Sequence, residues 1–162
     1  MNKQIFTLCA GAALAVLVLV GCKKNNRPDD LPDGVECVVS VVQDGKPLEG
    51  ATLLLNGVDA GNQKYAPGGT TDANGDCALC TYGFPGVAPG KYKVCIWKDV
   101  PEGGETEIDE ETGEETSVVG QEFMTVEQQY RIPNLTPLEV EITKGMEKPV
   151  FDVGESIRVP KR

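Results

Sequence analysis

A series of tight-turn signals between residues 43 and 98 constrains the fold of this chain more than any other feature. Glycine, proline, aspartate and asparagine gather at residues 44–50, 70–76 and 89–90, where they favour reversal of the chain. The short runs between these turns carry apolar residues at alternate positions, which is typical of strands with one buried face. Beyond the N-terminal apolar run, no segment has the i, i+3, i+4, i+7 recurrence of an amphipathic helix. The sequence therefore predicts an all-β fold.

Seven or eight strands are expected in all. The runs that qualify are residues 35–42, 51–55, 68–71, 77–82, 91–97, 123–126, 138–143 and 150–153. Short strands at this spacing are typical of a two-sheet antiparallel sandwich. The 162 residues suffice for one such domain with a core, and we place it at residues 35–153, followed by a C-terminal tail at 154–162.

The N-terminus predicts export and lipid anchoring. Lys3 precedes an uncharged apolar run that is too short and wrongly flanked for a stable membrane span. The residues Leu19-Val20-Gly21-Cys22 resemble the lipobox of bacterial lipoproteins, in which cleavage precedes a cysteine that carries the lipid. A plain secretory signal that happens to contain a cysteine is the alternative. We expect a signal peptide at residues 1–21, a lipid on Cys22 and, because Lys23 follows the cysteine instead of aspartate, the outer membrane instead of the inner.

The charge of the chain limits its partners. The net charge is −10, and removal of residues 1–21 takes away only Lys3, which makes it −11. An acidic surface repels phosphate groups, so nucleic acid is not an expected partner, and membrane attachment falls to the acyl chains. Residues 22–34 are polar, contain proline and lack periodicity, which predicts a flexible tether. We expect a monomer.

Acidic residues are concentrated between residues 101 and 119, where no basic residue occurs. The eight carboxylates are Glu102, Glu105, Glu107, Asp109, Glu110, Glu111, Glu114 and Glu115. Like charges at this density oppose compaction and predict a long exposed loop, with calcium binding as the less favoured alternative. Asp72, Asn74 and Asp76 also offer oxygen ligands, but their spacing around Gly75 favours a β-turn. No metal site and no cofactor is therefore predicted.

Several of these segments resemble a known family. The segments Asp44-Gly45-Lys46-Pro47-Leu48-Glu49-Gly50-Ala51-Thr52, Gly69-Thr70-Thr71-Asp72-Ala73-Asn74-Gly75 and Pro89-Gly90-Lys91-Tyr92-Lys93-Val94 resemble the carboxypeptidase regulatory-like domain. Tyr130, Pro133, Thr136-Pro137-Leu138 and Phe151-Asp152 look like those of small bacterial lipoproteins built from one such domain. The resemblance implies a transthyretin-like (prealbumin-like) sandwich in a secreted, lipid-anchored module that is structural or mediates binding. Its motifs are turn and packing signatures, which say little about activity.

Four cysteines depart from the usual strand residues of that family: Cys37, Cys77, Cys80 and Cys95. Outside the cytoplasm an even number of cysteines favours disulfides, and four of them allow three pairings. Strand alternation points Cys37 and Cys77 inward and Cys80 and Cys95 outward, which favours those two pairs. Cys77 and Cys80 also have the C-x-x-C spacing of a metal or redox pair, but on a strand their sulfurs point to opposite faces, so this reading is disfavoured.

The absence of histidine from the sequence limits the chemistry. It removes Ser-His-Asp and Cys-His catalysis and histidine-ligated zinc, including the histidines of hydroxyisourate hydrolases, which share the transthyretin-like fold. We assign no catalytic residue and expect no enzyme activity. Trp97 and Tyr82 are candidates for an outward aromatic patch that stacks on a sugar or a partner.

The expected function is a non-enzymatic, lipid-anchored module of the cell envelope that is structural or binds a protein or glycan. Two alternatives stay open at this point. One is a calcium-dependent binding module that uses the acidic loop, and the other is an envelope hydrolase that uses two carboxylates.

Overall fold

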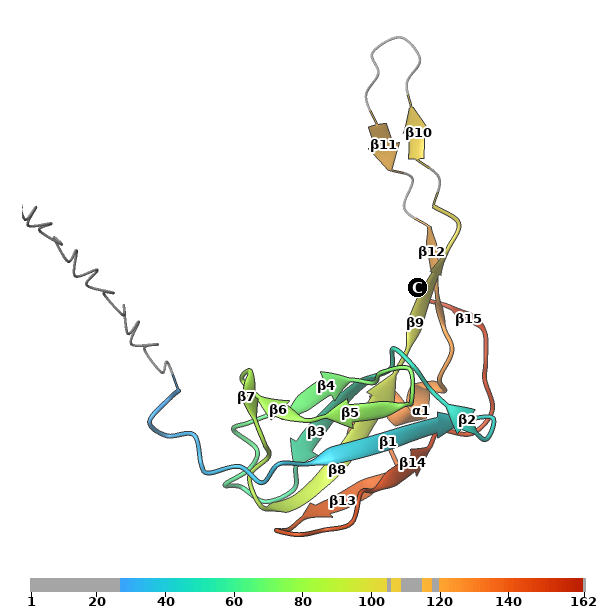
Figure 1. Cartoon of the computed structure of the whole chain (residues 1–162). Coiled ribbons are helices and arrows are strands. Elements are labelled where there is room, and N and C mark those ends of the chain that lie inside the picture. The colour runs from blue at the N-terminus through green and yellow to red at the C-terminus, as the bar shows by residue number, and fades with distance from the viewer. Residues whose placement is uncertain (1–26, 105, 109–114, 118–119, 162) are drawn as a thin grey trace, which may run out of the picture.

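The computed structural model describes residues 27–104, 106–108, 115–117 and 120–161, and these are almost entirely β (Figure 1). The largest sheet has the strand order β13-β8-β3-β4-β6-β7. Its strands are β3 (Thr52–Gly57), β4 (Gly68–Thr70), β6 (Cys80–Thr81), β7 (Phe84–Pro85), β8 (Gly90–Trp97) and β13 (Glu139–Ile142). All its pairings are antiparallel.

A second sheet packs against the first. It contains β1 (Val38–Gln43), β2 (Lys46–Pro47), β5 (Asp76–Ala78) and β14 (Val150–Asp152). β1 pairs antiparallel with β2 and β5, whereas its pairing with β14 is parallel and joins Val41 to Phe151. The prediction of an all-β sandwich is confirmed, and each of the eight predicted runs overlaps at least one strand.

The core lies between the inner faces of these two sheets. Val39 and Val41 from β1, Leu53 and Leu55 from β3, and Val94 and Ile96 from β8 are fully or almost fully buried in one cluster. These positions alternate along each strand, as strand geometry requires. Burial of each such side chain stabilises the fold by about 1.5–3 kcal/mol, so the core holds the two sheets together.

The predicted strand at residues 77–82 is divided in two. β5 pairs with β1 in the second sheet, and β6 pairs with β4 in the first. Leu79, between them, is buried, and the chain crosses from one sheet to the other at this residue. Cys77 and Cys80 therefore belong to different sheets.

The acidic segment forms strands where a loop was expected. β9 (Asp99–Glu102) pairs with β12 (Gln121–Met124), and beyond them β10 (Thr106–Ile108) pairs with β11 (Glu115–Ser117). These four strands are here called the acidic hairpin, and Figure 1 shows that it projects from the sandwich. β-branched residues, such as Thr106, Ile108 and Thr116, favour the extended conformation, and this preference accounts for strands in a segment whose charge density predicts an exposed loop.

Two further elements complete the fold. β15 (Val159–Pro160) pairs with β12, so part of the predicted tail belongs to a sheet. Helix α1 (Gln128–Arg131) is a single turn between β12 and β13. Within the described ranges, no helix has the length and apolar character to cross a membrane.

Candidate functional site

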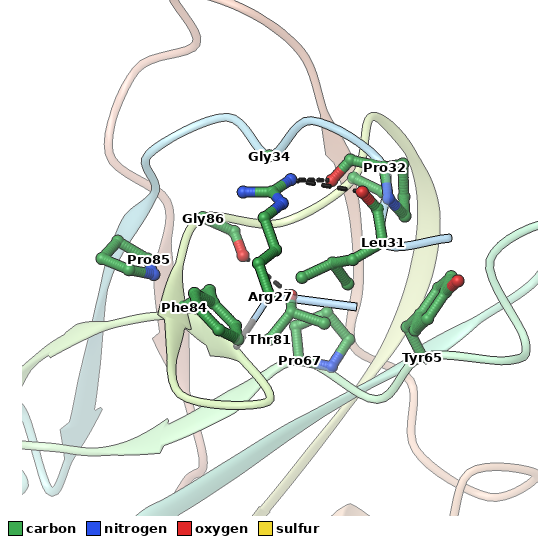
Figure 2. Close-up of a pocket in the computed structure, with 11 residues that line it drawn as sticks. Arg27, Leu31, Pro32, Gly34, Tyr65, Pro67, Thr81, Phe84, Pro85 and Gly86 are labelled. Carbon is green, nitrogen blue, oxygen red and sulfur yellow. Dashed lines mark hydrogen bonds between the residues drawn. The ribbon is translucent and has the colours of Figure 1, made fainter. Parts of the chain in front are cut away.

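The N-terminal segment at residues 27–34 packs against one end of the sandwich (Figure 2). Leu31 is only 8% exposed, and the Arg27 guanidinium donates hydrogen bonds to the carbonyl oxygens of Pro32 (2.8 Å) and Leu31 (3.3 Å). The backbones of Val35 and Val87 exchange two hydrogen bonds of 2.8 and 2.9 Å. Residues 27–34, part of the predicted tether, thus contact the sandwich through the buried Leu31 side chain, and the backbone pairing of Val35 continues this contact.

Side chains from the sandwich hold this segment from the other side. The Tyr65 hydroxyl donates a hydrogen bond to the carbonyl oxygen of Asp30, and Lys64 forms an ion pair with the Asp30 carboxylate. The hydrogen bond from Lys64 lowers the pKa of Asp30. Leu31, an isolated apolar residue among aspartates and prolines, was the one sequence signal that this segment docks.

The pocket at this docking site is already filled by the chain itself. Its lining residues are Arg27, Leu31, Pro32, Gly34, Tyr65, Pro67, Thr81, Phe84, Pro85, Gly86 and Ala88, and the free volume between them is about 10 Å³. A cavity of that size holds about one water molecule at most. The pocket is therefore a packing seam and has no room for a small-molecule ligand.

Tyr82 stands at the tip of the turn beside this seam. Tyr82 (φ 51°) and Gly83 (φ 80°) form the two-residue turn that joins β6 to β7, with Thr81 paired to Phe84. Tyr82 is 63% exposed; its ring meets the Tyr65 ring edge to face with 5.8 Å between centroids, and its hydroxyl donates a hydrogen bond to the Lys64 carbonyl oxygen (3.4 Å). The tip therefore presents an aromatic side chain to solvent on a left-handed backbone, which bulky residues rarely adopt.

Trp97 does not belong to the same surface. It lies at the far end of β8, and strands β3, β4 and β6 separate β8 from β7 in the sheet. The guanidinium carbon of Arg131 lies 5.8 Å from the centre of the Trp97 ring and engages it in a cation–π contact. Trp97 and Tyr82, the two candidates for an aromatic patch, therefore do not form one patch, because the strand order puts them in separate surroundings.

A polar network fixes the base of the acidic hairpin beside Trp97. A single Arg131 guanidinium nitrogen lies 2.6 Å from both carboxylate oxygens of Asp99, and Lys161 bridges Asp99 (3.0 Å) and Glu122 (2.6 Å). Burial raises the pKa of Asp99, but the hydrogen bonds from Arg131 and Lys161 outweigh it and leave the pKa lowered. The network joins α1, β9, β12 and the C-terminal segment, which no sequence motif indicated.

The charged side chains of this network can bind and orient a ligand, but the network is poorly suited to acid catalysis. An open hollow of about 470 Å³ beside it is lined by Met124, Gln128, Arg131, Val159, Pro160 and Lys161. A carboxylate that acts as a general acid near neutral pH needs a raised pKa, whereas that of Asp99 is lowered.

The four cysteines in the part of the chain that the structure describes, Cys37, Cys77, Cys80 and Cys95, are free thiols, which differs from the predicted disulfides. In the large sheet, Cys95 faces Leu54, Leu54 faces Gly68, and Gly68 faces Cys80. Strands lie about 4.8 Å apart, so these three steps separate Cys95 from Cys80 by roughly 14 Å. A disulfide requires Cα atoms within about 7 Å, and the favoured pairing of Cys80 with Cys95 is therefore wrong.

The other favoured pair, Cys37 with Cys77, is also not placed directly opposite across the two strands. Cys77 is directly opposite Val39, while the Cys37 carbonyl accepts a hydrogen bond from the Leu79 amide, so Cys37 and Cys77 are diagonal neighbours. Such diagonals are about 7–8 Å apart, too long for a relaxed disulfide. Burial above all, with the nearby thiols, raises the pKa of Cys77 to about 11, and burial raises the pKa of Cys37. These buried thiols are protonated and serve as small core residues.

The turn at residues 72–76 forms as predicted. The Asp72 carboxylate accepts hydrogen bonds from the amides of Asn74 (2.8 Å) and Asp76 (2.9 Å), and Gly75 takes a φ of 75°. The Asp76 carboxylate is engaged by Ser40 and by the Lys148 ammonium at 3.0 Å. Across the part of the chain that the structure describes, no group of three or more acidic or thiol side chains is arranged to hold a metal ion.

Cys22 and its lipobox-like neighbours lie outside the described residues, as does part of the acidic run. Lipidation of Cys22 and cation binding by the hairpin therefore stay predictions.

The comparisons with known proteins add little to this picture. Neither a family model nor a curated protein sequence matches the chain. Among solved structures, it is similar to the major pilin subunit of Bacillus cereus, with 16% sequence identity and a TM-score of 0.33. The match covers 78% of this chain and 30% of the pilin chain.

Proposed function

We propose that this protein is a lipid-anchored, non-enzymatic module of the bacterial cell envelope that holds an acidic hairpin away from the membrane to engage a protein or glycan. The observation that carries the proposal is the placement of two segments. The N-terminal segment docks near the start of β8, and the acidic hairpin continues from its end (Figure 1). β8 has eight residues, so the two attachment points are roughly 25 Å apart along the sandwich.

The direction of the hairpin supports a binding role. Its base is locked by Asp99, Arg131 and Lys161, which gives the projecting strands a fixed exit from the sandwich. Its carboxylates favour partners with a basic surface, since complementary charge speeds encounter and selects the partner.

The fold type is a second part of the proposal. We infer a transthyretin-like sandwich of the carboxypeptidase regulatory-like kind, anchored in the outer membrane. The turns at Asp44-Gly45 and at residues 72–75 form where the resemblance places them, with the positive φ angles that their glycines allow. The non-enzymatic character is supported by the lack of histidine in the sequence and by the lowered pKa of Asp99.

Anchoring is tested by metabolic labelling with a fatty-acid probe. The natural chain should incorporate the probe, and Cys22→Ala should not. Equal labelling of the two would refute the anchor and leave a plain secretory signal.

Partner binding is tested by proximity labelling in cells with the anchored protein and two variants. In the first, residues 103–120 are replaced by Asn-Gly, which suits a two-residue turn between Glu102 and Gln121, the last pair of β9 and β12. In the second, the seven carboxylates of residues 105–115 become amides, which keeps the hairpin and removes its charge.

Partners lost in both variants support a charged hairpin site. Partners that both variants retain would exclude the hairpin, and turnover of any envelope polymer by the purified protein would refute the non-enzymatic proposal.

A further inference from the structure

We infer that the end of the sandwich around the docked N-terminal segment rests on the lipid surface, with the Tyr82 side chain in the headgroup region. The inference deepens the proposed function and rests on it, because it assumes a lipid on Cys22. The surface, here called the seam end, comprises residues 27–34, Tyr65 and the turn between β6 and β7 (Figure 2).

The first argument is the length of chain between the lipid and the domain. Residues 27–34 are docked, so only residues 23–26 separate Cys22 from the ordered domain. Even fully extended, a connection of that length reaches less than about 20 Å. β8 alone is roughly 25 Å long, so the domain cannot turn freely above the bilayer and its seam end stays beside the lipid.

The second argument is the chemistry of Tyr82. A tyrosine ring has an apolar body and a polar tip, which suits the boundary between acyl chains and water. Tyr82 is 63% exposed at the tip of a turn, its ring meets the Tyr65 ring edge to face, and its hydroxyl donates a hydrogen bond to the Lys64 carbonyl oxygen (3.4 Å). The net charge of −11 for the processed chain as a whole disfavours a strong electrostatic attachment, and aromatic contact adds an attraction that does not depend on charge, beside the basic residues Lys23, Lys24 and Arg27 near the anchor.

The third argument is the backbone cost of this tyrosine. The turn of Asp44 (φ 52°) and Gly45 (φ 69°) has the same two positive φ angles and carries the Asp-Gly pair that such turns prefer. At the seam end the first position holds tyrosine, and the left-handed conformation costs a non-glycine residue roughly 1–2 kcal/mol. The Tyr65 ring contact and the hydrogen bond from the Tyr82 hydroxyl to the Lys64 carbonyl oxygen (3.4 Å) offset part of this cost, and together they hold the tyrosine in one exposed position at the seam end.

The test uses the full lipidated protein in phosphatidylcholine vesicles with brominated acyl chains, which quench nearby tryptophan fluorescence. The chain has a single tryptophan, so Trp97→Phe gives a protein without tryptophan fluorescence, into which one reporter tryptophan can be placed. Tyr82→Trp in that background reports on the seam end, and Val159→Trp, also exposed, reports on the far end beside the hairpin base. Should Tyr82→Trp fail to fold by circular dichroism, Val58→Trp, exposed after the end of β3, replaces it.

We expect bromine to reduce the fluorescence at the seam end to roughly half and to leave Val159→Trp unchanged, since interfacial residues sit within about 10 Å of the acyl boundary. Leu31→Asp, which should undock the N-terminal segment, is expected to abolish the quenching while the vesicles still carry the protein.

Vesicle flotation separates a failure of the lipid anchor on Cys22 from a failure of the proposed orientation. A chain that fails to float refutes the lipid anchor itself. A chain that floats without quenching at the seam end, or with equal quenching at both ends, refutes the orientation and leaves the anchor standing.

Discussion

Asp99 and Arg131 are 32 positions apart in the sequence, yet one guanidinium nitrogen lies 2.6 Å from both carboxylate oxygens of the aspartate. Asp99 begins β9, and Arg131 ends α1. The contact therefore ties the first strand of the hairpin to the helical turn that follows its last strand. Trp97 lies against the same guanidinium, so a single arginine joins the sandwich to the hairpin.

Replacement of Asp99 by asparagine should destabilise the protein at pH 7. The Asp99 side chain is 16% exposed, and loss of its charged hydrogen bonds should cost about 1–3 kcal/mol. Urea unfolding of the purified domain measures the loss, and Glu139→Gln, a more exposed carboxylate paired with Lys93, is the matched control that should change little. Equal losses in the two variants would contradict a special role for Asp99.

The contact of Asp99 with Arg131 should also make the free energy of unfolding depend on pH. The folded-state pKa of Asp99 lies below its ordinary value of 3.8, so its contribution is complete well above that value. The contribution is lost as the pH falls through the lowered folded-state pKa. In urea unfolding from pH 7 to pH 2, the difference between the natural chain and Asp99→Asn should therefore narrow below about pH 4. A constant difference over that range would refute the assignment.

Tyr82→Asn should stabilise the fold. Asparagine tolerates the left-handed conformation, and the Asn-Gly pair is favoured in this type of turn, so we expect a gain of about 1 kcal/mol. Thermal unfolding measures it, with Asp44→Asn as a control at the equivalent position of the other turn, where little change is expected. A loss of stability in Tyr82→Asn would show that the ring contact with Tyr65 outweighs the backbone cost.

Thiol titration should find four free cysteines in the processed, lipidated chain after denaturation without reductant. In the native protein only Cys80, which is partly exposed, should react quickly, because Cys37, Cys77 and Cys95 are buried. Recovery of no thiols after denaturation would restore the disulfide prediction and require a different register between the strands.

Gly69→Ala should destabilise the sandwich from a position where no positive φ is involved. A Cβ atom at Gly69 would lie 2.6 Å from the Cys77 sulfur, so the Cys77 side chain or the strand must shift, and overpacking of this kind costs about 1–3 kcal/mol. Cys77→Ala removes the sulfur and should recover part of that loss in the double variant, a coupling that urea unfolding can quantify. If the losses of the two single variants simply add in the double variant, the strain in Gly69→Ala does not come from contact with the Cys77 sulfur.

Strand positions could be predicted from the sequence because alternation and turn chemistry are local signals. Leu138, Val140 and Ile142 alternate with polar residues and form or adjoin β13, and the turn at residues 72–76 forms as expected. Register between strands is not local, which is why the pairing of Cys80 with Cys95 was wrong. Docking of Leu31 and the contact of Asp99 with Arg131 join distant segments, and composition alone could not indicate either.

The parallel pairing of β1 with β14 affects how the chain acquires its structure. β1 starts at Val38, and its partner on this edge does not appear until Val150, more than a hundred residues later. Contacts over such separations form late, since a long loop must close before they can contribute. The sheet thus stays incomplete until Val150 has been synthesised, and in a chain exported as proposed above this edge closes only after most of the chain has been made.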